Sequence, residues 1–124
     1  MRKAICVVVI KNGCILLVQK HKTWILPGGK PEVGESNMQC LLREAGEELP
    51  KLRLQNLKYF GAFSGITPHK NDGLCAEVYI ANSDGEITTA AEINEAKWVN
   101  EPEEYNLSDI TQKIVLSLRQ NGYL

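Results

Sequence analysis

The sequence has few of the features that would place it in a membrane or among proteins that coat nucleic acid. Its longest early apolar run, Ala4 to Ile10, is too short to span a bilayer, and no small-residue cleavage pattern follows it. Lys and Arg (14 residues) nearly balance Asp and Glu (15 residues), so the net charge is only −1. That balance argues against broad binding to nucleic acid or to anionic lipid. We expect a cytoplasmic protein with no membrane partner and no stable nucleic acid partner.

Cysteine and histidine are too scattered to suggest a metal centre or a disulfide framework. The four cysteines form no C-x-x-C pair, and the two histidines are far apart in the sequence. A zinc site needs tighter spacing of Cys and His. We therefore expect reduced cysteines in or near the core, where unpaired cysteine behaves as a small apolar residue. They are Cys6, Cys14, Cys40 and Cys75.

What is present is the composition of one globular domain. The chain has 124 residues, of which 44% are hydrophobic and 23% charged, and this favours a single domain over residues 1–124. Hydrophobic patterning predicts three strands, a helix, three further strands and a last helix. We therefore predict an α/β (α+β) fold with a mixed β-sheet flanked by helices. The predicted strands are 3–10, 14–20, 24–29, 52–66, 74–82 and 96–100, the turns are Asn12–Gly13, 67–73 and Ser83–Gly85, and the helices are 36–49 and one from Leu107.

The predicted helix over 36–49 has a charge pattern that points to a ligand. Four apolar residues fall in one stripe, which we expect to face the core: Met38, Leu42, Ala45 and Leu49. Three carboxylates fall in an arc on the opposite side: Glu44, Glu47 and Glu48. Their mutual repulsion and the negative end of the helix dipole both disfavour this cluster. A hard divalent cation would neutralise it, and a solvated acidic face is the alternative.

The residues before this helix supply a tight backbone turn. Gly28–Gly29 follows a short strand, and adjacent glycines let the backbone turn sharply and approach a ligand closely. Ser36 is a suitable N-cap for the first helix, and Ser108 or Asn106 for the second. A glycine loop beside an acidic helix face forms a site for a metal-bound phosphate.

The same segment resembles the Nudix box, G-x5-E-x7-R-E-U-x-E-E-x-G-U, in which U is a bulky aliphatic residue. Ala45 is small for its aliphatic position, and Pro50 and Lys51 replace the closing glycine and the last aliphatic residue. The resemblance implies the Nudix fold, an α/β/α sandwich. Six fixed positions match at the correct spacing: Gly29, Glu35, Arg43, Glu44, Glu47 and Glu48.

The resemblance also implies an activity and a set of site residues. Nudix hydrolases act on a nucleoside diphosphate linked to another moiety, with Mg²⁺ and sometimes Mn²⁺ as cofactor. Arg43 would orient a neighbouring glutamate, while Gly28 and Glu35 would support the loop and the helix start. Carried over by position, the metal ligands would be the Gly29 carbonyl, Glu44, Glu47 and Glu48.

The general base is left open by the resemblance, because the family takes it either from the box or from a later loop. In this chain Glu47 is the catalytic candidate within the box. Glu92 is the first candidate in the later loop and Glu95 the second. Both loop carboxylates can equally be solvent-facing side chains without a catalytic role.

The substrate also stays open among a nucleoside triphosphate, ADP-ribose and a nucleotide sugar. Pro68 lies near the position where ADP-ribose-directed members of the family carry a proline, although a turn explains it locally. The segment Lys20–Lys22 can meet phosphate or merely end a hairpin. A Nudix-fold nucleotide sensor or interaction module without turnover is the alternative function, and an α/β domain that binds no metal is the third. A homodimer also stays open.

Overall fold

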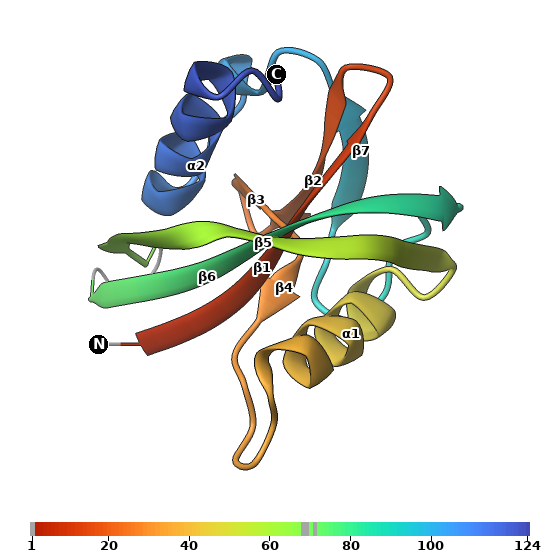
Figure 1. Cartoon of the computed structure of the whole chain (residues 1–124), viewed down its shortest axis with the longest axis vertical. Helices are drawn as coiled ribbons and strands as arrows, with labels where there is room; N and C mark the ends of the chain where they lie inside the picture. The colour runs from red at the N-terminus through yellow and green to blue at the C-terminus, as the bar shows by residue number, and fades with distance from the viewer. Residues whose placement is uncertain (1, 68–69, 71) are drawn as a thin grey trace.

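The computed structural model describes residues 2–67, 70 and 72–124, and it shows two helices on opposite sides of a twisted β-sheet (Figure 1). This arrangement confirms the predicted α+β fold. Pro68 and His69 lie outside the described residues. In chain order the elements are β1 (Arg2–Lys11), β2 (Cys14–Lys20), β3 (Thr23–Ile25), β4 (Gly28–Gly29), α1 (Asn37–Glu48), β5 (Leu52–Ile66), β6 (Gly73–Gly85), β7 (Glu95–Val99), the 3-10 helix η1 (Pro102–Glu104) and α2 (Asp109–Gln120).

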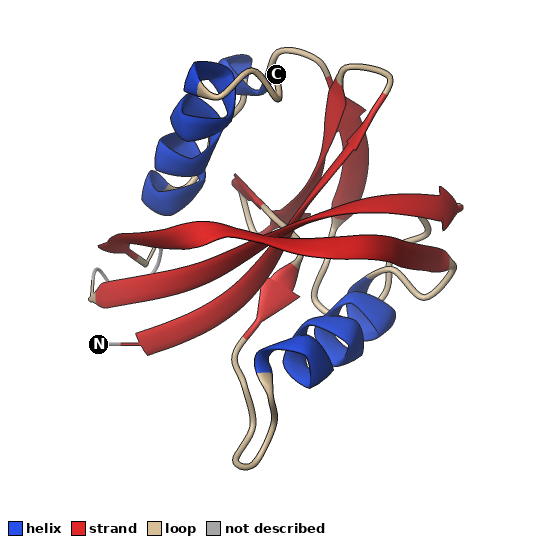
Figure 2. Cartoon of the chain, viewed as in Figure 1, coloured by secondary structure: helices blue, strands red, loops and turns tan. Residues whose placement is uncertain are grey.

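Strand β1 lies at the centre of the sheet, which has the order β3-β2-β1-β6-β5. Figure 2 shows the strands in red, with the two helices in blue on either side of them. Strand β1 pairs in parallel with β6 and antiparallel with β2 and with the short strand β4. Strands β3 and β7 both pair with β2, and β5 pairs with β6. One parallel pair among antiparallel pairs makes the sheet mixed, as predicted. The Asn12–Gly13 turn joins β1 to β2, and both of its residues have positive φ angles.

Two apolar cores lie on the two faces of this sheet. Successive residues of β1 alternate between them, so the strand is buried on both faces, as its continuous apolar sequence predicts. The core beneath α1 includes Ile5, Val7, Val9, Leu41 and Leu49. The core beneath α2 includes Val8, Ile15, Leu17, Ile114 and Leu118.

The face of α1 that enters the core differs from the prediction. Met38 and Leu42 are 36% and 49% exposed, so their predicted place in the core is wrong, although the other two residues of the stripe are buried. The helix is rotated towards its acidic side, which buries Glu48 together with Leu41. The buried face of α1 carries Cys40, Leu41 and Ala45, and Glu48 on the same face accepts a hydrogen bond from the Gly28 amide of β4. The three carboxylates therefore do not share one solvent-facing arc.

Several element boundaries also differ from the prediction. The predicted turn at Ser83–Gly85 is part of β6, because β5 begins at Leu52 and pairs with β6 as far as Gly85. Helix α2 is capped by Ser108, whose hydroxyl accepts a hydrogen bond from the Thr111 amide. All four cysteines are free, as expected. Within the described part of the chain, no helix has the length and apolar character needed to cross a membrane.

Candidate functional site

The start of α1 is fixed by its own local sequence. Ser36 Oγ accepts a hydrogen bond from the Gln39 amide at 3.1 Å, and Gln39 Oε1 accepts one from the Ser36 amide at 2.9 Å. This reciprocal pair is a capping box, which satisfies two amides at the helix N-terminus. In the preceding loop, Glu35 Oε1 accepts a hydrogen bond from the Glu32 amide at 2.8 Å. These bonds fix how the loop enters the helix.

Strand β4 consists of two glycines, and a side chain at either position would displace a neighbour. Gly28 has a φ of 149°, and a Cβ there would collide with the Ile5 carbonyl of β1. A Cβ on Gly29 would collide with the carboxylate of Glu44. Helix α1 can therefore lie close enough to β4 for the Glu44 carboxylate to contact the Gly29 backbone.

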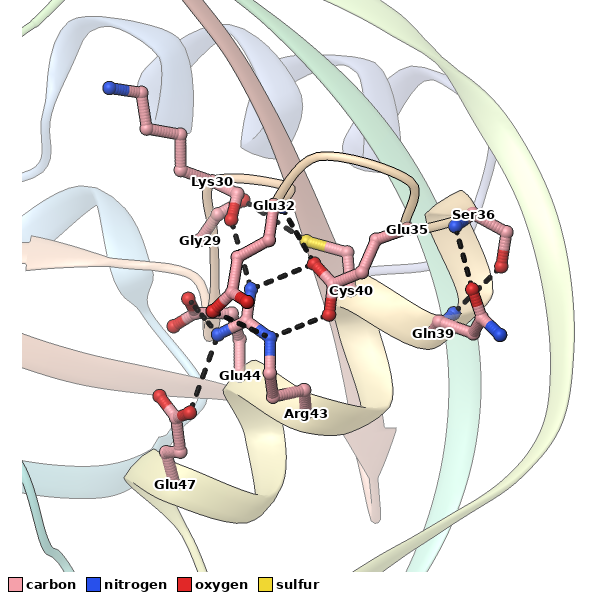
Figure 3. Close-up of polar contacts among 10 residues, drawn as sticks. All are labelled: Gly29, Lys30, Glu32, Glu35, Ser36, Gln39, Cys40, Arg43, Glu44 and Glu47. Carbon is pink, nitrogen blue, oxygen red and sulfur yellow. Dashed lines mark hydrogen bonds and ion pairs between the residues drawn. The ribbon is translucent and has the colours of Figure 1, made fainter.

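Arg43 gathers the acidic side chains of the loop and the helix, as Figure 3 shows. Its Nε and Nη2 donate to the two oxygens of Glu35, at 2.6 and 2.9 Å. Its Nη1 donates to Glu44 at 2.9 Å and to Glu47 at 3.3 Å, while Nη2 also donates to the Lys30 carbonyl at 3.0 Å. The hydrogen bonds from Arg43 lower the pKa of Glu35 to about 2. The loop and the helix are thus joined through one guanidinium.

Glu48 lies deeper than the other acidic residues of α1. Its side chain is buried, with the residue 6% exposed, and its Oε1 accepts a hydrogen bond from the Gly28 amide at 3.0 Å. Burial raises the pKa of Glu48 from 4.5 to about 7, and the Gly28 hydrogen bond and the charge of Lys20 partly oppose that rise. The carboxylate form of Glu48 is therefore poorly stabilised by the protein alone, and a nearby cation would stabilise it.

The donor atoms beside β4 have the chemistry that a hard divalent cation needs. They are all oxygens, from the Gly29 carbonyl and from Glu44, Glu47 and Glu48. The Glu44 carboxylate fills the space over Gly29, and the Gly29 carbonyl accepts a contact from Cys40 Sγ at 3.7 Å. Across residues 2–67, 70 and 72–124, no three or more His, Cys, Asp or Glu side chains are gathered as a metal cluster. Arg43 explains this, because it draws the carboxylates of Glu44 and Glu47 to itself. These oxygen ligands suit a hard divalent cation. Two of the carboxylates, those of Glu44 and Glu47, are held by the Arg43 guanidinium.

The candidate bases of the later loop do not join this cluster. The Glu92 side chain is 76% exposed and pairs with Lys20 at 2.7 Å, and this hydrogen bond lowers the pKa of Glu92. Glu95 opens β7 and pairs with a lysine of the same strand. The loop is nevertheless fixed beside α1, because the Ala90 amide donates to the Glu48 carbonyl at 3.0 Å.

A mostly apolar cavity of about 230 Å³ opens beside the two glycines of β4. It lies between the sheet and α2, with Ile25 and Ile114 among its apolar walls. Its polar lining includes the hydroxyls of Ser108 and Thr111, which are hydrogen-bonded to each other at 2.7 Å. Lys20 is the only charged residue among the described residues that line it. The cavity and the acidic helix therefore meet at Gly28 and Gly29, which line the cavity and contact Glu48 and Glu44.

Sequence reasoning missed two features of this region. The pairing of Lys20 with Glu92 was not predicted, although the basic run at 20–22 was noted as one that can meet phosphate. Ser108 was predicted as a cap alone, whereas the structure also places it in the cavity wall together with Thr111. Nothing in the spacing of these residues along the chain indicates that they meet.

Comparison with known structures shows the same fold in several proteins. A putative Nudix hydrolase family member from Chromobacterium violaceum is 24% identical, with a TM-score of 0.77 over 97% of this chain and 77% of that chain. A MutT protein from Bacillus halodurans is 23% identical, with a TM-score of 0.76 over 94% of this chain and 80% of that chain. A bifunctional NMN adenylyltransferase/ADP ribose pyrophosphatase from Francisella tularensis, complexed with AMP and a Mn ion, is 22% identical, with a TM-score of 0.77. The match covers 97% of this chain and 41% of that one.

The family is shown by sequence. No curated protein sequence matches this chain significantly. The family model of the NUDIX domain, however, matches residues 1–116. Since that match spans most of the sequence and includes the whole of the acidic helix and its glycine loop, the chain belongs to the NUDIX domain family, whose hydrolases act on nucleotide pyrophosphate linkages.

Proposed function

We propose that this chain is a Mg²⁺-dependent hydrolase that cleaves the pyrophosphate linkage of a nucleoside diphosphate joined to another moiety. The observation that carries the proposal is the position of the oxygen donors. Glu44 and Glu48 approach the backbone of Gly28–Gly29, and the same two glycines form part of the cavity wall. A substrate that places one end in the cavity would have its phosphates beside Gly28 and Gly29, on whose backbone the two carboxylates lie.

The residues that would hold the cation are the Gly29 carbonyl, Glu44, Glu47 and Glu48, with Mn²⁺ as the alternative ion. When bound, the cation would neutralise the charge of the pyrophosphate and make a water molecule more acidic. Arg43 holds Glu44 and Glu47 in the substrate-free protein, so a cation would have to draw their carboxylates away from the guanidinium. Its ion pair with Glu35 fixes the guanidinium itself.

The reaction needs a group that accepts a proton from water. The water oxygen forms a bond to phosphorus, the bridging P–O bond breaks, and the leaving phosphate keeps the electrons of that bond. Glu92 is the first candidate for the proton acceptor, because its exposed side chain stands on a loop that is fixed against α1. Glu47 is the candidate within the box, since its side chain is 53% exposed and its bond to Arg43 is long, at 3.3 Å.

The cavity limits what the rest of the substrate can be. Its volume of about 230 Å³ is small for a whole nucleotide and suits one base or one sugar. Its buried polar groups, Ser108 and Thr111, are hydroxyls that already bond to each other. Nucleoside triphosphates, ADP-ribose and nucleotide sugars each offer such a group next to a pyrophosphate, so these are the substrate classes we propose.

A nucleotide sensor without turnover is the second candidate, because Pro50 and Lys51 replace the last positions of the box. The structure shows how the chain leaves the helix despite this change. Leu49 caps α1, and its carbonyl accepts a hydrogen bond from the Leu52 amide at 3.1 Å, so the chain turns directly into β5. The turn follows Glu48 and leaves its bond to β4 in place, which favours catalysis over binding alone.

The test is turnover of a panel of nucleoside triphosphates, ADP-ribose, nucleotide sugars and dinucleoside polyphosphates, each with Mg²⁺ and with chelator. We expect release of a nucleoside monophosphate with Mg²⁺ only, and its loss in Glu47→Gln. Glu86→Gln, which removes an exposed carboxylate outside the site, is the matched control and should keep full activity. Binding of Mg²⁺ and nucleotide without any turnover would favour the sensor.

A further inference from the structure

Lys20, at the end of β2, touches both the cavity and the candidate base. It is the only charged residue among the described residues lining the cavity, where it stands with Gly28 and Gly29. Its Nζ lies 2.7 Å from Glu92 Oε2. One ammonium group therefore lies between the place where a nucleotide would enter and the carboxylate proposed to accept a proton.

The guanidinium of Arg43 has no such freedom. Arg43 donates to Glu35, Glu44 and Glu47 and to the Lys30 carbonyl, so its guanidinium is engaged on several sides. A phosphate approaching it would compete with all of these acceptors. Lys20 offers three donors on a flexible side chain, and its pairing in the structure is with a single carboxylate.

The bond between Lys20 and Glu92 is one that a phosphate can displace. Their side chains are 37% and 76% exposed, and ion pairs in such solvated positions are weak. A pyrophosphate group carries more negative charge than one carboxylate, so it attracts the ammonium more strongly at the same distance. A nucleotide in the cavity would therefore draw Lys20 away from Glu92.

We propose that Lys20 is a positioning residue that exchanges partners, holding Glu92 in the substrate-free protein and moving to a substrate phosphate oxygen on binding. The move leaves the Glu92 carboxylate free to accept a proton from water. The loop backbone stays in place, because the Ala90 amide is bonded to the Glu48 carbonyl and the Asn94 amide to the Gln19 carbonyl, at 3.0 and 2.8 Å. Only side chains need to turn. The inference rests on the proposed function.

The experiment compares Lys20→Met, Lys20→Arg and Glu92→Gln with the wild type. Lys22→Met is the matched control, because it removes an exposed positive charge two residues away that does not line the cavity. Hydrolysis of ADP-ribose and dGTP with Mg²⁺ gives kcat and KM. Titration calorimetry with ADP in chelator gives binding without turnover.

Partner exchange predicts opposite effects for the two residues. Lys20→Met should raise KM and weaken ADP binding by about 10- to 100-fold, the effect of one charge-assisted hydrogen bond, while kcat changes by less than about threefold. Glu92→Gln should lower kcat by about 100-fold and tighten ADP binding, since Lys20 no longer has a competing partner. Lys20→Arg should restore most of the affinity.

Other results would overturn the inference. If Lys20→Met behaves like Lys22→Met, the effect is one of general charge and Lys20 has no specific role. If Glu92→Gln binds ADP no more tightly than the wild type, the two anions do not compete for Lys20. If the wild type neither hydrolyses the probes nor binds ADP, the proposed function fails before the inference is reached.

Discussion

Replacing Glu48 with Gln should stabilise the metal-free protein at pH 8, although it removes a predicted metal ligand. Folding buries the Glu48 carboxyl to 6% exposure, and this raises its pKa from 4.5 to about 7. The folded protein therefore holds this proton more tightly than the unfolded chain does. The free energy of unfolding then falls as the pH rises from about 4.5 to about 7. Glutamine has no charge to bury, and its amide oxygen can still accept the Gly28 hydrogen bond.

The size of the effect follows from the shift in pKa. Each unit is worth about 1.4 kcal/mol, so a rise from 4.5 to about 7 amounts to roughly 3 to 4 kcal/mol at most. Urea denaturation in chelator should show wild type and Glu48→Gln equally stable near pH 4. At pH 8 the variant should be more stable by up to roughly 3 to 4 kcal/mol. Equal or lower stability of the variant at pH 8 would refute the reasoning.

A control and a metal arm complete this test. Glu47→Gln removes the neighbouring carboxylate, which is 53% exposed, and shows whether losing any acidic residue near Arg43 has the same effect. Addition of Mg²⁺ at pH 8 should then stabilise the wild type, because a ligand that binds only the folded state raises the free energy of unfolding. The free energy of unfolding of Glu48→Gln should rise less on addition of Mg²⁺. A gain as large as that of the wild type would remove Glu48 from the ligand set.

Three further changes have expected results. Gly29→Ala should abolish Mg²⁺-dependent turnover, because its Cβ collides with the Glu44 carboxylate, and undiminished turnover would contradict the close approach of α1 to β4. Arg43→Lys should lower kcat by about 10-fold or more, since an ammonium cannot replace the paired bonds to Glu35; an unchanged kcat would count against this role. Asp109→Ala should lower the free energy of unfolding in urea by about 1 kcal/mol, because the Ile66 amide loses its acceptor, and unchanged stability would argue against that bond.

Local signals in the sequence predicted the parts of the fold that depend on near neighbours. The Asn12–Gly13 turn and the Ser36 cap each lie where their residues indicate, because turn and cap geometry is decided within a few positions. The burial of β1 on both faces also agrees with its continuous apolar run, since a strand between two cores buries successive side chains on alternate faces. The acidic positions of the box come from the resemblance of this segment to the Nudix motif, and their role in holding a metal stays a prediction.

Long-range contacts account for what the sequence did not predict. The apolar stripe on α1 was predicted from the hydrophobicity of its residues. Hydrophobicity alone cannot predict that a carboxylate of the helix bonds to a strand. The Gly28 amide holds Glu48 inside, and the helix turns so that Met38 and Leu42 face solvent. Likewise the pairing of Lys20 with Glu92 joins residues far apart in the chain, and no local pattern records it.

The most direct test of the proposed function is ³¹P NMR of ADP-ribose and dGTP incubated with the protein, with Mg²⁺ or with chelator. We predict that the pyrophosphate signals of at least one substrate disappear and that a nucleoside monophosphate signal grows, with Mg²⁺ only and not in Glu47→Gln. Substrate signals that persist in Mg²⁺ for both compounds, or that disappear equally fast in chelator, would contradict metal-dependent hydrolysis at Glu44, Glu47 and Glu48.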